Sequence, residues 1–122
     1  MLFRSEITAL HCTYDDTTKG GWSDDGRKVK GTMHWVSAEH AVNAKVNLYE
    51  KLFTVDNPAK EADFTTCLNP NSLTTVDALV EPSLLDSKPL DKFQFERTAY
   101  FCVDKDSSKE QLIFNRTVTL RG

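Results

Sequence analysis

Hydrophobic and polar residues alternate along several stretches of the chain, as in β-strands that bury one face. In residues 28–35 the odd positions hold Val, Gly, Met and Trp, and the even positions hold Lys, Lys, Thr and His. Residues 44–52, 92–103 and 111–121 alternate as well and are rich in β-branched and aromatic residues. Because no helical periodicity extends over ten or more residues, the pattern predicts an all-β chain.

Turn-forming residues separate these stretches. They lie at residues 19–21 with 25–26, 56–58, 69–71, 81–83 and 104–108. Five or six short strands joined by such turns predict an antiparallel barrel or sandwich. Short helical turns are expected at residues 37–41 and 59–68, where they would cover the ends of a barrel.

Composition narrows the class of protein. The 122 residues are 39% hydrophobic and 27% charged, which is typical of a soluble domain with one core. No stretch approaches the roughly 20 apolar residues of a membrane helix, and the N-terminus has no signal-peptide pattern. We therefore expect a cytoplasmic protein. The formal charge of -3 disfavours nucleic-acid binding through a generally basic surface, so any RNA contact must be local.

Sequence signals of catalysis and metal binding are lacking. The three cysteines are widely spaced, and none of the three histidines stands at a ligand spacing from a cysteine or carboxylate. Paired aspartates flank turns and lack the apolar surroundings that would raise a carboxyl pKa. No Gly-rich phosphate loop is present. We expect no catalytic centre, metal site or cofactor within these residues.

Five blocks of sequence carry a family resemblance. They are residues 25–38 (DGRKVKGTMHWVSA), 68–73 (LNPNSL), 81–84 (EPSL), 93–102 (with FQFER and YFC) and 114–121 (with FNRTV and LR). In order and spacing, these blocks resemble the C-terminal anticodon-binding region of glutaminyl-tRNA synthetases. The archaeal and eukaryotic type of glutamyl-tRNA synthetase shares that architecture, but the HWVS and QFER blocks are more similar to the glutamine enzyme.

The resemblance implies a fold and a place in a larger enzyme. The family has two antiparallel six-stranded β-barrels of the ribosomal-protein-L25-like type, and residues 7–122 are expected to form the distal barrel with strands of the proximal one. Residues 1–6 do not resemble the family, and we expect them to be artefactual or disordered. The catalytic half and its ATP-binding signatures have no counterpart here. The chain is therefore expected to be an inactive part of a glutamine–tRNA ligase, whose catalytic domain would bind ATP and magnesium.

The resemblance also assigns two RNA-binding residues. In the family, the glutamine and arginine of the QFER block recognise the middle uridine of the anticodon, and these are Gln94 and Arg97 here. An amide offers a donor and an acceptor to the edge of an unstacked base, and a guanidinium bonds to base or phosphate. Residues three apart on a regular strand point to opposite faces, so a β-bulge or bend between them is predicted. The alternatives are a solvated Gln94 and an ion pair of Arg97 with Glu96 or Glu110.

Four further cations are candidate RNA or barrel-rim contacts. Arg116 is in phase with the apolar positions of residues 111–121 and is expected close to Arg97 if the last two strands form a hairpin, although a structural ion pair is its alternative. Arg121 follows on the same stretch. Lys28 and Lys30 share one polar face, and aspartates precede them, so a solvated strand face is equally expected.

Two functional hypotheses remain open at this point. In the first, the chain contacts the anticodon loop of glutamine tRNA as part of a monomeric enzyme that does not bind membranes, and it packs against the catalytic and proximal-barrel parts. In the second, it is a structural fragment without RNA binding of its own. Two base-reading side chains that contribute about 1–3 kcal/mol each predict weak binding by the chain alone.

Overall fold

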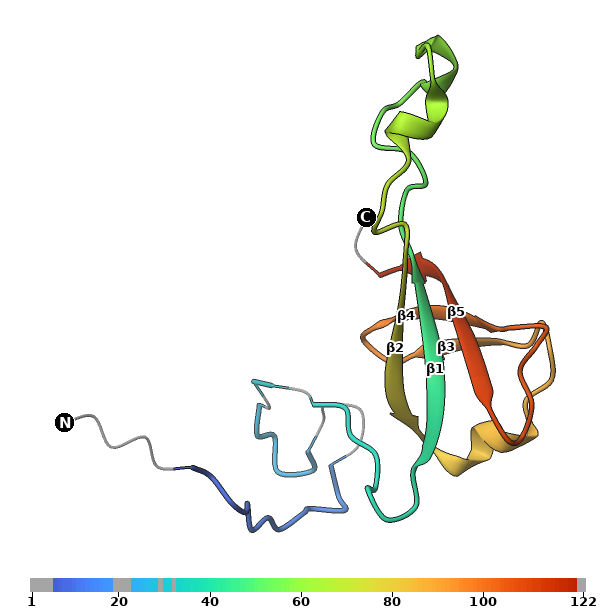
Figure 1. Cartoon of the computed structure of the whole chain (residues 1–122). Coiled ribbons are helices and arrows are strands. Elements are labelled where there is room, and N and C mark those ends of the chain that lie inside the picture. Colours follow the sequence, from blue (N-terminus) through green and yellow to red (C-terminus); the bar gives the residue numbers. More distant parts are fainter. Residues whose placement is uncertain (1–5, 19–22, 29, 32, 121–122) are drawn as a thin grey trace. The chain divides into compact units, whose positions relative to one another are not determined.

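A computed structural model of the chain describes residues 6–18, 23–28, 30–31 and 33–120. It divides into two compact units, Met1–Met33 and His34–Gly122. The described residues of the first unit form turns but no helix or strand. The second unit contains a five-stranded sheet, so the sequence-predicted all-β class is confirmed (Figure 1).

The sheet is built from strands that are not arranged in sequence order. The strands are β1 (Val42–Tyr49), β2 (Leu73–Val80), β3 (Lys92–Phe95), β4 (Ala99–Val103) and β5 (Leu112–Thr119), and the 3-10 helices are η1 (Pro58–Lys60), η2 (Phe64–Cys67) and η3 (Pro82–Asp86). In space the order is β2-β1-β5-β4-β3. The pairs β1–β2, β3–β4 and β4–β5 are antiparallel, whereas β1 and β5 are parallel.

The predicted antiparallel six-stranded barrel is not what the described residues form. They contain five strands in one open sheet, with β2 and β3 at its edges, and one of the four strand pairs is parallel. Parallel neighbours need a long crossover between them. The chain provides it, because β2, η3 and the β3–β4 hairpin all lie between β1 and β5 in the sequence.

Period-two alternation places one face of β1, β3, β4 and the first half of β5 in the core, and β2 contributes only its end near Val80. Phe114 is fully buried at the centre, and its ring lies edge-on to Phe93 at 6.3 Å and to Phe95 at 5.3 Å, while Phe95 stacks on Phe101 at 4.2 Å. Burial of each such side chain contributes about 1.5–3 kcal/mol to the free energy of folding. The other buried core residues are Ala44, Val46, Val80, Leu84, Ala99, Val103 and Leu112.

The strand predicted at residues 28–35 is absent among the described residues of that segment. Their backbone is irregular, and Met33 and Trp35 are exposed. A strand is stabilised by hydrogen bonds to a neighbour, and no described strand pairs with this segment. Alternation alone was therefore a misleading signal here. Val29 and Thr32, which belong to the same run, lie outside the described residues.

An arm formed by residues 50–72 connects β1 to β2 and extends beyond the end of the sheet (Figure 1). Phe53 and Leu68 form a β-bridge in it, and the Phe53 ring lies edge-on to Phe64 at 6.5 Å. Helix η2 begins after Asp63, whose carboxylate accepts a hydrogen bond from the Thr65 amide. The helical turns predicted within residues 59–68 are thus confirmed as η1 and η2.

Candidate nucleic-acid interface

The two residues of the QFER block with predicted roles lie on the β3–β4 hairpin. Residues 92–103 were predicted as one strand, but the chain reverses at residues 96–98, where the Thr98 amide donates to the Phe95 carbonyl at 2.9 Å. Phe95 and Ala99 are directly opposite each other. The bend predicted between Gln94 and Arg97 is therefore a complete turn, with Arg97 at its tip.

Arg97 has a backbone conformation that is rare for a side-chain-bearing residue. Its φ is 60°, and the only other non-glycine residue with positive φ among the described residues is Leu90 at 73°. A positive φ at the second central position is the signature of a type II turn, which glycine usually occupies. An L-residue there costs about 1–2 kcal/mol. Strained backbone of this kind tends to occur at functional sites, and the Arg97 side chain is exposed.

Gln94 and Arg97 are both exposed and unpaired. Gln94 points away from the core because its neighbours Phe93 and Phe95 pack against the core. Within the described part of the chain, neither side chain forms a hydrogen bond, and no ion pair joins Arg97 to Glu96 or Glu110. The salt bridges found in the described part of the chain are formed by other arginines and by lysines. The amide and the guanidinium are thus available to an external partner.

A shallow hollow of about 450 Å³ adjoins the tip of the hairpin. Arg97 and Thr98 line one side, and Thr119 and Leu120 from the end of β5 line the other. The hollow therefore combines one cation, two hydroxyls and one apolar side chain. Sequence reasoning did not single out Thr98, Thr119 or Leu120 as site residues, and only the pairing of β4 with β5 brings Thr119 and Leu120 to the hairpin that contains Thr98.

A β-bulge in β5 shapes the neighbouring surface. Tyr100 is opposite Val118, but the next residue, Phe101, is opposite Arg116, so Thr117 is the extra residue. The bulge shifts the alternation of β5 by one position. Val118 consequently lies opposite the exposed Tyr100 on the outward face and is exposed, which corrects the expectation that it shares a face with Leu112 and Phe114.

Arg116 has the structural role that was its alternative interpretation. Its guanidinium donates to the Tyr49 carbonyl at 3.1 Å and pairs with the Glu50 carboxylate at 2.6 Å. Only 19% of its side chain is exposed. These bonds tie β5 to the end of β1, so Arg116 is not available to RNA in the way that Arg97 is.

A chain of polar side chains crosses the outward face next to the hairpin. Thr75 donates to Asn47, Asn47 donates to Asn115 and Asn115 donates to Asp104, at 2.8, 2.8 and 2.6 Å. Together with the Asp106 backbone amide, the Asn115 amide holds the pKa of Asp104 below its ordinary value. The network links β2, β1, β5 and the turn after β4, and this makes the outward face rigid.

The remaining predicted cations belong to the first unit or lie outside the described residues. Lys28 and Lys30 are exposed in the first unit, and neighbouring Arg27 pairs with Asp15 and Asp25 at 2.5 Å each. The Thr17 hydroxyl and Arg27 lower the pKa of Asp15. Arg121 lies outside the described residues. An RNA contact of these three residues therefore stays a prediction.

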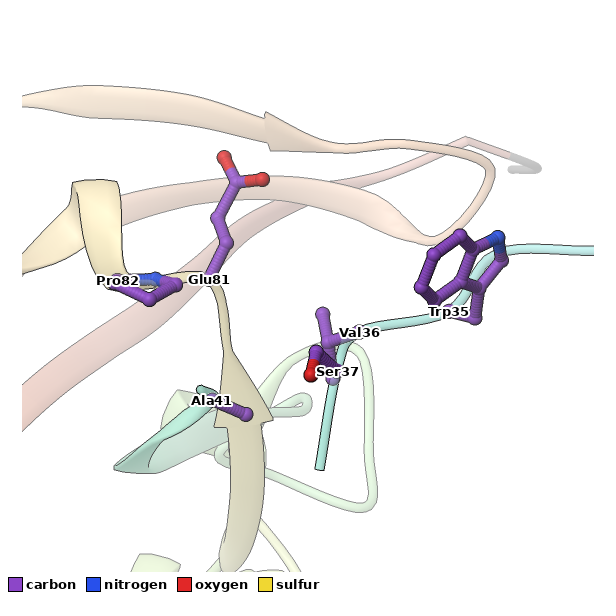
Figure 2. Close-up of a pocket in the computed structure, with 6 residues that line it drawn as sticks. All are labelled: Trp35, Val36, Ser37, Ala41, Glu81 and Pro82. Atoms are coloured by element: carbon purple, nitrogen blue, oxygen red, sulfur yellow. The ribbon is translucent and has the colours of Figure 1, made fainter. Parts of the chain in front are cut away.

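A second hollow, of about 280 Å³, lies at the start of β1 (Figure 2). The side chains that line it are mostly apolar, and its one charge is the Glu81 carboxylate, which accepts a hydrogen bond from Ser83 at 3.0 Å. A carboxylate repels phosphate, so this hollow is a poorer candidate for RNA. Its lining consists of Trp35, Val36, Ser37, Ala41, Glu81 and Pro82.

Two classes of site are not found in the described part of the molecule. No group of three or more histidine, cysteine, aspartate or glutamate side chains is placed there to hold a metal ion. None of the helices described is long and apolar enough to cross a bilayer.

An open five-stranded sheet with a hydrophobic core on one face and an exposed hairpin defines an all-β domain. Residues 32–104, more than half of the chain, match the family described as the anticodon-binding domain of class I tRNA synthetases (E and Q). The chain belongs to this family.

The chain is similar to several glutamine–tRNA ligases. Those of Pseudoalteromonas atlantica and Vibrio vulnificus are each 55% identical to it, over 97% and 94% of the chain, and that of Photobacterium profundum is 56% identical over 94%. The resemblance to the glutamine enzyme is therefore confirmed. The chain spans about a fifth of the length of these relatives, 21–22%.

Proposed function

We propose that this chain is the part of a glutamine–tRNA ligase that reads the anticodon of glutamine tRNA, with Gln94 and Arg97 contacting the middle uridine. The observation that carries the proposal is that these two side chains are exposed and unpaired on a hairpin anchored by the aromatic core. Family membership and the high identity to glutamine–tRNA ligases support it.

The chemistry of the two side chains matches a pyrimidine edge. The Watson–Crick edge of uridine presents carbonyl acceptors and one N–H donor, and an amide can satisfy one of each. The guanidinium of Arg97 adds donors in a planar fork that suits a base carbonyl or a phosphate. A cytidine at the same position presents donor and acceptor in the reverse order, so the amide discriminates between the two bases when its orientation is fixed by a neighbouring contact. Discrimination of about 1–3 kcal/mol per good base contact is the expected scale.

The proposed role places this chain within a larger, cytoplasmic, monomeric enzyme. The other parts would bind ATP and magnesium and attach glutamine to the tRNA, while this region reports a correct anticodon. The net charge of -3 offers little general attraction to RNA, so the chain alone is expected to bind in the high micromolar range. In the complete enzyme, contacts to the rest of the tRNA would add to this affinity.

The sheet edges support a second part of the proposal, that further strands complete a six-stranded barrel in the complete enzyme. Edge strands β2 and β3 leave backbone groups available for pairing, and β2 is exposed on both faces except near Val80. Hydrogen exchange tests this. Slower exchange of β2 or β3 amides in the complete ligase than in this chain is expected, whereas equal exchange in both would contradict closure.

Titration of the chain with anticodon stem-loops tests the reading function. Loops with uridine or cytidine at the middle position are compared for the wild-type chain and for Gln94→Ala and Arg97→Ala. We expect preference for uridine in the wild type and its loss in both variants. Arg116→Lys keeps a cation beside the Glu50 carboxylate and serves as a control that should retain the preference. A folded wild-type chain that binds neither loop would favour the scaffold hypothesis instead.

A further inference from the structure

An aromatic ring on the outward face of the hairpin has no role in the proposal so far. Tyr100 of β4 is directly opposite Gln94 of β3, and its side chain points away from the core because Ala99 and Phe101 on either side are buried. Directly opposite residues of an antiparallel pair have Cβ atoms about 4.5–5.5 Å apart. The ring therefore stands beside the Gln94 amide, and 43% of Tyr100 is exposed.

The bulge of β5 gives this ring an apolar border. Val118 is opposite Tyr100 on the other side from Gln94, and the shift caused by Thr117 turns it outward, where 58% of it is exposed. The Thr117 hydroxyl donates to the Tyr100 carbonyl at 3.2 Å and so fixes the backbone that carries the ring. Among the described residues the Tyr100 side chain forms no hydrogen bond. Gln94, Tyr100 and Val118 thus make a row across three adjacent strands.

We propose that Tyr100 is a further RNA-contact residue, whose ring stacks on the anticodon base that Gln94 reads. Unpaired RNA bases are commonly bound by stacking on an aromatic side chain while their edges are hydrogen-bonded. A base resting on the Tyr100 ring keeps its Watson–Crick edge within reach of a side chain on the neighbouring strand. The inference rests on the proposed function and adds to it the group that holds the plane of the base.

An exposed lysine near Gln94 on this face suits the phosphate of an RNA ligand. Lys92 lies two residues from Gln94 on the same face of β3 and is exposed. Its ammonium forms no ion pair with the described residues, and it stands about 7 Å along the strand from Gln94. This spacing suits a phosphate adjacent to the bound nucleotide. On this single face the Tyr100 ring could contact the plane of the base, the Gln94 amide its edge and the Lys92 ammonium the phosphate.

The test compares ring substitutions by NMR titration of the chain with the uridine loop. Tyr100→Phe keeps the ring and should bind within about twofold of the wild type, whereas Tyr100→Leu should lose about fivefold or more in affinity. Tyr49 is the matched control, because it is 48% exposed on the outward face of β1, with β5 between it and β4. Tyr49→Leu should bind like the wild type. In the wild-type complex, the ring current of Tyr100 should shift the uridine H5 and H6 signals upfield.

The outcomes separate this inference from the proposed function. If the wild type prefers uridine and Gln94→Ala removes the preference, but Tyr100→Leu binds like the wild type, the stacking role is wrong and the reading function stands. If the wild type shows no preference for uridine, the reading function fails and the stacking role fails with it. Should Tyr100→Leu unfold, the upfield shift in the wild type and its persistence in Tyr100→Phe decide the question, and an unshifted uridine overturns the inference.

Discussion

Replacing Arg97 with glycine separates the folding cost of its backbone conformation from the binding role of its side chain. At φ 60° a side chain costs about 1–2 kcal/mol, which glycine does not incur. Glycine in turn loses about 0.5–1 kcal/mol through the greater freedom of the unfolded chain. Among the described residues, the side chain of Arg97 forms no hydrogen bond or ion pair that would be lost. We therefore expect Arg97→Gly to raise the free energy of unfolding by about 0.5–1 kcal/mol.

Two other variants isolate the two effects. Arg97→Ala keeps a Cβ and hence the strain, so its stability should match that of the wild type. Leu90→Gly relieves the same strain at φ 73°, where the leucine is 73% exposed and has little packing to lose. It should be stabilised as much as Arg97→Gly. Urea unfolding followed by circular dichroism measures all three, and a gain of this size corresponds to a rise in Tm of about 2–5 °C.

Binding should separate the same variants differently. Arg97→Gly and Arg97→Ala lose the guanidinium and should lose about 1–3 kcal/mol of binding free energy for the uridine loop. Leu90→Gly should bind like the wild type. A more stable Arg97→Gly that also kept full affinity would refute the binding role of the arginine. A loss of stability in both glycine variants would refute the argument from backbone strain.

Further variants test the core, the polar network and the outward face. Phe114→Ala should lower the free energy of unfolding by about 3–5 kcal/mol in urea titrations, because the ring is fully buried. Asn115→Ala should lower it by about 1–3 kcal/mol, since Asn47 and Asp104 lose a partner. Because the folded pKa of Asp104 lies below its ordinary value of 3.8, its contribution is present above that pH and is lost as the pH falls through the folded value. Unfolding titrations should therefore show a shallower acid limb for Asp104→Asn. Lys92→Ala should weaken the uridine and cytidine loops equally and reduce the slope of log affinity against log salt by about 0.7.

The sequence predicted the elements whose pattern is simple. Strands β1 and β5 bury one face, and their alternation was visible in residues 44–52 and 111–121. Strand β2 was not predicted. It is exposed along both faces from Leu73 to Asp77, so no alternation marks it. The opposite error occurred at residues 28–35, where the alternation is clear but no described strand is available to pair.

The geometry of the site followed from features without a sequence signal. A turn with positive φ usually contains glycine or asparagine. Because Arg97 occupies this position instead, the sequence did not show that residues 92–103 divide into the two strands β3 and β4. The bulge at Thr117 likewise has no composition of its own, so the outward rotation of Val118 could not be foreseen. Gln94 and Arg97 were found through the family resemblance. Tyr100 could be recognised only when the register placed it opposite Gln94.

Chemical-shift mapping of the isotopically labelled chain with the uridine anticodon loop tests the central claim most directly. The account predicts that the largest changes occur at the Gln94 side-chain amide, the Arg97 guanidinium and the Tyr100 backbone, and that the cytidine loop produces smaller changes at the same signals. Changes confined to residues 23–31 or to the arm of residues 50–72, with the hairpin unaffected, would contradict it.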